Sequence, residues 1–382
     1  MQARVLHSLD QLPADTWNTL AGRDNPFLRY EFLAALEHSG CTTPATGWTP
    51  HHLLIESGHA GQRQVLAAVP LYLKNNSYGE YVFDWAWADA YARSGLAYYP
   101  KLVAAVPFSP VTGARILTRV PGDTAQIEEA AIAASLALAK ELSLSSLHWL
   151  FTPPAQTERL EGHGLLRRVG YQFHWHNQDY TDFDHFLAGF SSRKRKKIRH
   201  ERRSVADAGV TLEVCGGAQM TPALWDVFYD FYHLTIRKHG AIPYLTRAFF
   251  HELGRSMPDN IVMIFAHHQS RPVAAALNLR GTDTLYGRYW GGEDGYSGLH
   301  FETCYYRAID YCIQHGLRRF EAGAQGEHKL ARGFLPVATY SAHWLSHPQF
   351  YQAVQDYLRR ERHGVESYMT ELNEHSPFKR SC

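Results

Sequence analysis

The sequence predicts an α/β or α+β protein built from two domains. Strand and helix signals alternate along the whole chain, a pattern typical of mixed sheets flanked by helices. Its 382 residues are too many for one ordinary domain and suit two. The order strand, turn, strand, strand, helix, strand occurs once in each half. We therefore expect two domains of similar topology, residues 1–180 and residues 181–382, the second ending in a helical tail.

The first half supplies short apolar runs and one long periodic segment. The predicted strands are residues 52–55, 65–73, 78–87 and 147–151. A glycine-containing turn at 58–61 joins the first two strands, and the third is rich in aromatic residues. Residues 124–142 are predicted to be helical, because apolar side chains recur there at a spacing of three to four.

The second half repeats this order. The predicted strands are residues 261–266, 273–279, 284–291 and 317–321. A helix is expected over 301–315, closed by Gly316, because glycine commonly follows the last helical residue. A polar, helical tail is expected over 356–374.

The two halves align as an internal repeat. The segments 53–55, 67–69 and 78–81 precede 261–263, 274–276 and 286–289 by about 208 residues each. Beyond these segments the offset between the two copies falls to about 170 residues, because Leu147 aligns with Leu317. The shorter offset indicates an insertion near 89–118 in the first copy. A repeat of this length favours duplication of one fold.

Composition excludes several classes of protein. The net charge of +1 gives no overall field for nucleic acid or membrane. The first residues carry no basic and apolar signal sequence, and no apolar run is long enough to span a bilayer, so we expect a cytoplasmic protein. The five cysteines are scattered, which argues against a disulfide framework. Neighbouring histidines on strands face opposite ways, so no metal site is expected.

One segment is strongly basic. Residues 191–203 contain eight Lys or Arg and one Glu, so the segment carries +7 and the rest of the chain −6. In a helix, Arg195, Arg199 and Arg202 share one face, while Ile198 and Val205 form a narrow apolar stripe. The segment is either a solvated helix that aids solubility or a binding surface for phosphates, an RNA backbone or acidic lipid. We favour a phosphate or RNA partner and expect no DNA binding.

Residues 319–334 contain the densest set of reactive side chains. A short strand leads into a glycine-rich loop that carries Glu321, Glu327, Lys329 and Arg332. Glycine where the backbone must turn, followed by titratable groups, is typical of a site at the carboxyl end of a strand. A surface loop with a Glu–Lys ion pair is the alternative. The sequence has no P-loop, dinucleotide, serine-hydrolase or zinc-protease motif.

Several long strings resemble the FemAB-like family of bacterial proteins, within the GNAT-like acyltransferases. They are residues 25–28, 32–37, 70–74, 77–85, 191–196, 285–291 and 321–336. The resemblance implies two GNAT-like folds in tandem, each a mixed twisted sheet flanked by helices. Fem transferases move an amino acid from aminoacyl-tRNA to an amine of a peptidoglycan precursor. Their basic-helix motif falls on residues 192–199 and implies that Arg195 contacts precursor phosphates, while their conserved lysine falls near Lys329 or Arg332.

These observations predict N-acyl transfer from an activated donor to a primary amine. Glu321 or Glu327 would act as the base, and Lys329 and Arg332 would stabilise the oxyanion or the leaving group. The expected substrate-binding residues are Arg195, Arg199, Tyr286, Arg288, Asp84 and Lys74.

Two acyl donors are considered. Aminoacyl-tRNA is favoured over acyl-CoA, because the [QR]xxGx[GA] pyrophosphate motif is absent. The alternatives are an acyl-CoA-dependent acetyltransferase of small molecules and a non-catalytic protein that binds RNA or cell-wall precursors. Peripheral membrane contact is compatible with either.

Overall fold

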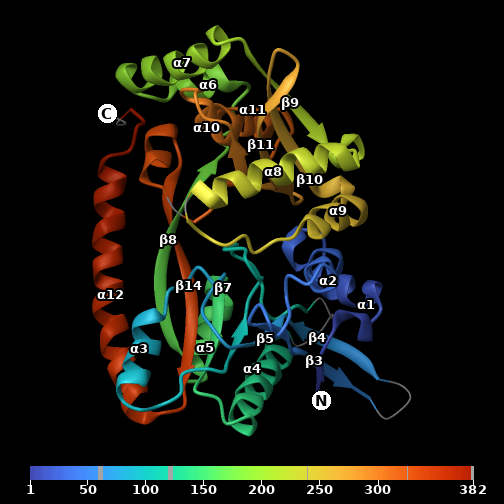
Figure 1. The fold of residues 1–382 in the computed structure, drawn as a ribbon. Helices are drawn as coiled ribbons and strands as arrows, with labels where there is room; N and C mark the ends of the chain where they lie inside the picture. The colour runs from blue at the N-terminus through green and yellow to red at the C-terminus, as the bar shows by residue number, and fades with distance from the viewer. Residues whose placement is uncertain (59–62, 119–123, 239, 325, 380–382) are drawn as a thin grey trace. The chain divides into compact units, whose positions relative to one another are not determined.

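The computed structural model describes residues 1–58, 63–118, 124–238, 240–324 and 326–379 (Figure 1). These residues form two compact units. Unit 1 contains Met1–Tyr171 and Ala338–Ser367, and unit 2 contains Gln172–Val337 and the described residues from Tyr368 onward. The expected boundary between residues 180 and 181 falls within unit 2, and the expected helical tail is divided between the units.

Unit 1 contains two sheets and the helices that cover them. Its elements are β1 (Gln2–Leu6), α1 (Ala14–Ala21), α2 (Tyr30–His38), β2 (Trp48–Pro50), β3 (His52–Ser57), β4 (Gln64–Val69), β5 (Leu71–Lys74), α3 (Trp85–Arg93), β6 (Lys101–Ala104), α4 (Thr124–Glu141), β7 (Ser146–Thr152) and α5 (Pro154–Gly162). β8 (Leu166–His176) begins in unit 1 and ends in unit 2, and β14 (Leu335–Leu345) runs from unit 2 into unit 1. The long helix α12 (Pro348–Glu374) follows β14.

The strands of unit 1 are mostly antiparallel. β1, β3 and β4 form one small sheet, and β2, β5, β6, β7 and β14 pair in that order. Only β6 and β7 are parallel, and α4 provides the crossover connection that a parallel pair requires. α4 packs Ile127, Ala131 and Ile132 into the buried core of the unit.

Pro70 divides a strand that the sequence predicted to be continuous over 65–73. β4 pairs with β3, whereas β5, on the other side of Pro70, pairs with β2 and β6. Proline has no N–H to continue a ladder, and this accounts for the break. The predicted turn at 58–61 lies largely outside the described residues.

The prediction of a third strand over 78–87 is wrong. The segment is a loop with positive φ angles at Gly79 (78°) and Tyr81 (59°), followed by the helix α3. The strand was predicted from the aromatic content of the segment, but in α3 the aromatic residues Trp87 and Tyr91 are buried one helical turn apart. The third strand is instead β6, inside the segment interpreted as an insertion, so the alignment of 78–81 with β12 is also wrong.

Unit 2 is built around one mixed sheet. Its other elements are α6 (Phe183–Ala188), α7 (Ser192–Asp207), β9 (Val210–Gly216), α8 (Pro222–Lys238), α9 (Arg247–Ser256), β10 (Ile261–His268), β11 (Arg271–Arg280), β12 (Thr284–Gly292), α10 (Leu299–Phe301), α11 (Arg307–Gln314) and β13 (Arg319–Glu321). The strand order is β9, β10, β11, β12, β13, β8, and only β12 and β13 are parallel.

Most elements predicted for the second half are confirmed. The hairpin β10–β11, strand β12, the helix before β13 and the basic helix all form where the sequence placed them. The helix before β13 differs in one respect, because Glu302–Tyr306 winds as a π-helical turn between α10 and α11. Such turns occur often at functional sites. Among the described helices, none is both long and apolar enough to cross a membrane.

Candidate active site

The parallel strands β12 and β13 separate at their carboxyl ends. They pair only at Thr284–Arg319, Leu285–Phe320 and Tyr286–Glu321. β12 then continues along β11 to Gly292, whereas the chain after Glu321 turns away through Gly323, which has a φ of 82°. The separation opens a gap in the sheet beside the polar loop that the sequence analysis selected.

A bulge lies in β12 at this gap. Leu277 of β11 faces Tyr289 and Asn278 faces Gly287, so Arg288 has no opposite residue. Bulges redirect a side chain and are common next to active sites. Here the bulge presents Arg288 at the wall of a cavity.

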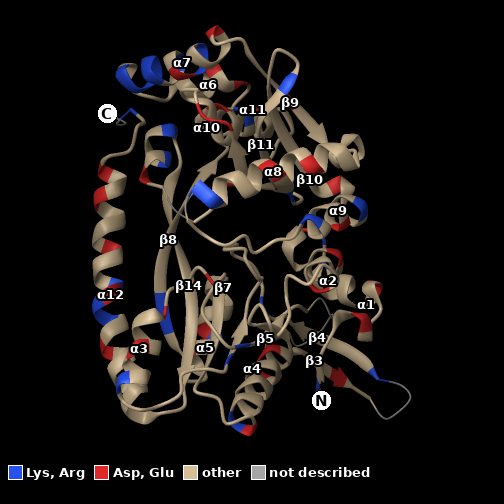
Figure 2. Ribbon diagram, in the orientation of Figure 1, with Lys and Arg blue, Asp and Glu red and all other residues tan. Residues whose placement is uncertain are grey.

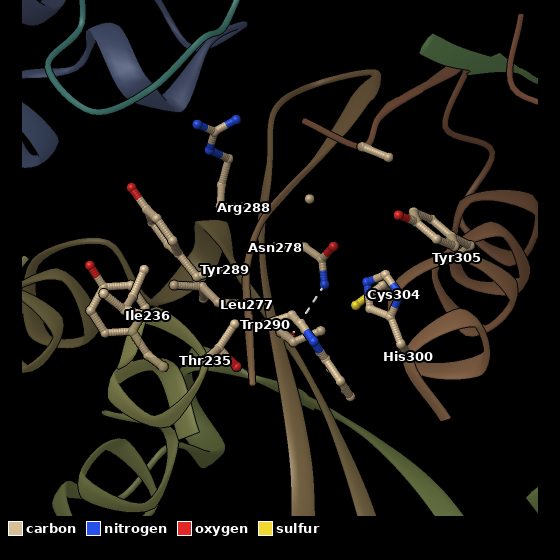
Figure 3. A pocket seen from close by; sticks show the side chains of 14 residues that line it. Thr235, Ile236, Leu277, Asn278, Arg288, Tyr289, Trp290, His300, Cys304 and Tyr305 are labelled. Atoms are coloured by element: carbon tan, nitrogen blue, oxygen red, sulfur yellow. Dashed lines mark hydrogen bonds between the residues drawn. The ribbon is translucent and has the colours of Figure 1, made fainter. Parts of the chain in front are cut away.

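The cavity has a volume of about 260 Å³ (Figure 3). Residues from α8, β11, β12 and the helix after β12 line it, together with Ala322 just beyond β13. The lining side chains that Figure 3 labels are Thr235, Ile236, Leu277, Asn278, Arg288, Tyr289, Trp290, His300, Cys304 and Tyr305. Of the predicted site residues, only Arg288 lines the cavity. Sequence reasoning missed Asn278 and His300, which belong to no motif.

Glu321 is a buried acid at the point where the strands part. Its exposed fraction is 2%, its ion-pair partner is Arg319 with Nε 3.2 Å from Oε1, and neither carboxylate oxygen accepts a hydrogen bond from the described residues. Burial raises its pKa to about 7, against the opposing charges of Arg319 and Arg288. A carboxyl group with this pKa is suited to accept a proton near neutral pH.

Lys329 is the matching buried base on the loop after β13. It lies on the 3₁₀ turn Glu327–Arg332 and donates a hydrogen bond from Nζ to the carbonyl oxygen of Gly323 at 2.9 Å. Burial and the charge of Arg288 lower its pKa to about 7. Arg288 therefore acts electrostatically on both Lys329 and Glu321.

Comparison with known proteins places the chain in a family. Residues 8–380 match the FemAB-like family, described as peptidoglycan biosynthesis/recognition. The chain belongs to the FemAB-like family. No curated protein matches the sequence.

Solved structures show the same fold at low sequence identity. FemX has a TM-score of 0.54 and 10% identity, covering 93% of this chain and 100% of FemX. The C-terminal domain of a putative lysylphosphatidylglycerol synthetase from Agrobacterium fabrum has a TM-score of 0.52 and 9% identity, covering 90% and 95%. L-PGS from Bacillus licheniformis has a TM-score of 0.50 and 10% identity, covering 94% and 99%. The predicted α/β fold class of two GNAT-like domains is thereby confirmed for this FemAB-like protein.

Not every predicted catalytic residue of the FemAB-like chain lies at the gap. Arg332 is held away from it by Glu201, whose two carboxylate oxygens lie 3.0 and 3.1 Å from Nη2, and its guanidinium lies 3.3 Å from the centre of the Phe301 ring. Glu327 is exposed and accepts a hydrogen bond from Tyr368. Tyr286, in β12, is buried and does not line the cavity.

The basic helix α7 of this FemAB-like protein is partly neutralised by its own unit. Arg199 pairs with Asp184 at 2.7 Å, and Arg202 pairs with Glu302 and Asp310 at 3.0 and 2.8 Å. Arg195 is half-buried, with Nη1 3.4 Å from the carbonyl oxygen of Phe190. The exposed cations of α7 are Arg193, Lys196, Lys197, Arg199 and Arg203, and Figure 2 shows Lys and Arg gathered along this helix.

Asp84 and Lys74 belong to one buried cluster of charges in the interior of unit 1, together with Glu80 and Lys101. Lys101, which the sequence analysis missed, places Nζ 2.9 Å from Glu80 and 2.5 Å from Asp84. Lys74 lies 3.9 Å from Glu80, and burial lowers its pKa to about 7. These four side chains are at most 4% exposed, so in this conformation Asp84 and Lys74 cannot touch a substrate. A lysine inside the apolar run 101–104, directly after a proline, was the only signal of this buried cluster.

Proposed function

We propose that this chain transfers an aminoacyl group from aminoacyl-tRNA to a primary amine, at the gap between β12 and β13. One observation carries the proposal: Arg288, which lines the cavity at the gap, acts electrostatically on both the buried carboxyl of Glu321 and the buried amine of Lys329. Family membership supports the reaction class, and the family description supports an acceptor amine on a cell-wall precursor.

The side chains match the needs of acyl transfer. The amine nitrogen forms a bond to the carbonyl carbon of the donor ester, and the ester C–O bond then breaks, releasing the tRNA hydroxyl. Ionised Glu321 takes the proton that the attacking nitrogen loses, because its pKa lies near neutrality. Arg288 and the ammonium form of Lys329 stabilise the negative charge that develops on the carbonyl oxygen and the leaving oxygen.

The connection after β12 favours an ester of tRNA over acyl-CoA. In GNAT enzymes that use acyl-CoA, backbone amides at this strand-to-helix turn hold the pyrophosphate. Here the turn carries Glu293, paired with Arg271 at 2.9 Å, and Asp294, paired with Lys238 at 2.6 Å. Two carboxylates at this position oppose the binding of a pyrophosphate.

The exposed side of α7 supports a polyanionic donor. Its cations Arg193, Lys196, Lys197 and Arg203 have no ion-pair partner in the described chain other than Glu201, which lies 3.9 Å from Lys197. Such a row repels itself unless a polyanion neutralises it.

Transfer of label from two donors tests the proposal. The protein is incubated with charged tRNA carrying a labelled amino acid, with and without RNase, and in parallel with labelled acetyl-CoA, with cell extract as the source of acceptors. We expect label to move from intact tRNA only, and about 10² more slowly with Glu321→Gln. Transfer from acetyl-CoA alone would contradict the proposal.

A charge reversal on α7 tests the donor surface separately. Lys196→Glu combined with Lys197→Glu should weaken tRNA binding, with a smaller dependence of log Kd on log salt concentration, because two phosphate contacts are lost. Arg359→Glu, a change on the exposed surface of α12, serves as the matched control. Equal binding by both proteins at every salt concentration would assign α7 to solubility.

A further inference from the structure

The walls of the cavity carry almost no charge. Among the described residues that line it, Arg288 is the only Lys or Arg and there is no Asp or Glu, and His300 is neutral at pH 7 because burial lowers its pKa to about 4. Its volume of about 260 Å³ exceeds the roughly 150 Å³ of a protein cavity that accommodates benzene. A group the size of an aromatic amino-acid side chain can therefore enter.

Two sets of aromatic rings form opposite walls. On the α8 side, Tyr232 and Tyr289 meet with ring centres 5.3 Å apart. On the other side, His300 lies 5.0 Å from Trp290 and 5.4 Å from Tyr305 (Figure 3). Together with Leu277 and Ile236, these rings form a surface that favours apolar groups and offers a cation no carboxylate.

Asn278 is the polar exception, and its amide has a fixed orientation. The residue is 1% exposed, and Nδ2 donates to the carbonyl oxygens of Val262 and Ala276 at 3.2 and 3.4 Å. Both donors of the amide are thereby used on one side, so Oδ1 points away from them, toward the gap beside Gly287 (Figure 3). No described residue donates a hydrogen bond to Oδ1. An acceptor directed into a cavity can accept a hydrogen bond from an N–H or O–H donor on the ligand.

We infer that this cavity selects the transferred group as an aminoacyl group with an uncharged, apolar side chain, whose α-amino N–H is bound by Oδ1 of Asn278. The side chain lies between the aromatic walls, and the ester carbonyl is directed toward Arg288. Cationic side chains are rejected because the walls provide no carboxylate, and anionic ones because the single wall cation, Arg288, is engaged by the ester carbonyl. This inference rests on the proposed function, since only an aminoacyl donor supplies the α-amino group.

Competition among charged tRNAs tests the selectivity. Labelled alanyl-, leucyl-, phenylalanyl-, lysyl- and aspartyl-tRNA are compared for transfer by the wild-type protein. We expect the lysyl and aspartyl groups to be transferred about a hundredfold less efficiently than the best apolar group, because a buried charge would be unpaired. Transfer of lysyl or aspartyl groups within threefold of the apolar ones would overturn the inference.

Two variants test the assigned contacts. Asn278→Asp places a carboxylate in the wall and should raise the ratio of lysyl to phenylalanyl transfer at least tenfold. The matched control is Asn260→Asp, because the Asn260 amide donates a hydrogen bond to the carbonyl oxygen of Arg280 and does not line the cavity. Ala276→Leu fills part of the cavity and should reduce phenylalanyl transfer relative to alanyl transfer. If Asn278→Asp does not fold, this variant tests the selectivity of the cavity in its place. Unchanged ratios in the folded variants would overturn the assignment.

A binding measurement separates this inference from the proposed function. If no charged tRNA serves as donor, the binding of phenylalaninamide and lysinamide is measured by ligand-observed NMR. Binding of phenylalaninamide alone, lost in Ala276→Leu, would support the cavity's selectivity and refute only the aminoacyl-tRNA reaction. Binding of neither amide, or of both equally, would refute the selectivity itself.

Discussion

Replacing Glu321 by Gln should make the protein more stable at alkaline pH while it loses activity. The carboxyl group is 2% exposed, and burial raises its pKa from 4.5 to about 7. At 1.36 kcal/mol per pH unit, ionising the buried carboxyl lowers the free energy of unfolding by about 3 kcal/mol. The cost of ionising the buried group is absent below pH 4.5, grows as pH rises and is complete above pH 7.

The glutamine variant escapes this cost, because it stays neutral at every pH. Its free energy of unfolding should therefore equal that of the wild type near pH 4 and exceed it by up to about 3 kcal/mol at pH 8.5. Activity should move in the opposite direction. Wild-type kcat/KM should rise with pH up to about 7, as Glu321 ionises, and the variant should be about 10² slower and lack this dependence.

Urea unfolding at pH 4.5 and 8.5, with transfer assays on the same preparations, measures both effects. Glu374→Gln, an exposed change at the end of α12, serves as control and should alter neither. A Glu321→Gln variant destabilised equally at both pH values would show that the carboxylate is structurally satisfied. A variant within tenfold of wild-type activity would remove Glu321 from the mechanism.

Three further changes test other parts of the structure. Lys329→Met should lower transfer strongly and raise stability by up to about 5 kcal/mol below pH 7, because burial lowers the lysine pKa from 10.5 to about 7; the gain should vanish above pH 10.5 in urea titrations. Lys101→Met should destabilise unit 1 by about 3–5 kcal/mol in calorimetry, since it leaves two buried acids without their ammonium partner, whereas exposed Lys140→Met should cost under about 0.5 kcal/mol. Gly333→Ala should cost about 1–3 kcal/mol in the same measurement, because φ is 88° and the new Cβ would lie 2.8 Å from Phe186; wild-type stability would refute the strain.

Local patterns were sufficient for the regular elements. The helix predicted over 124–142 formed as Thr124–Glu141, because its apolar spacing is set by neighbours three and four residues away. The hairpin β10–β11 also formed from local signals, two continuous apolar runs on either side of a short turn. The failure at 78–87 was also local, since the aromatic residues that favoured a strand there can equally be buried on one face of a helix.

The candidate site was predictable in part. The loop after β13 was selected for its glycines and charges, and Glu321, Lys329 and Arg288 do lie near the gap. The sequence could not separate Glu321 from Glu327, because both follow the same strand within six residues. Burial separates them: one is enclosed by the sheet, and the other is exposed.

The sequence by itself determined the family, the fold class and the positions of most strands and helices, because these depend on residues close together in the chain. Tertiary structure alone decided that Asp84 pairs with Lys101 inside unit 1, that Arg332 is held by Glu201, and that Asn278 turns its oxygen toward the cavity. Each of these depends on partners that are distant in sequence. Desolvation and hydrogen-bond geometry, which set the charge and reach of a side chain, exist only once those partners have met.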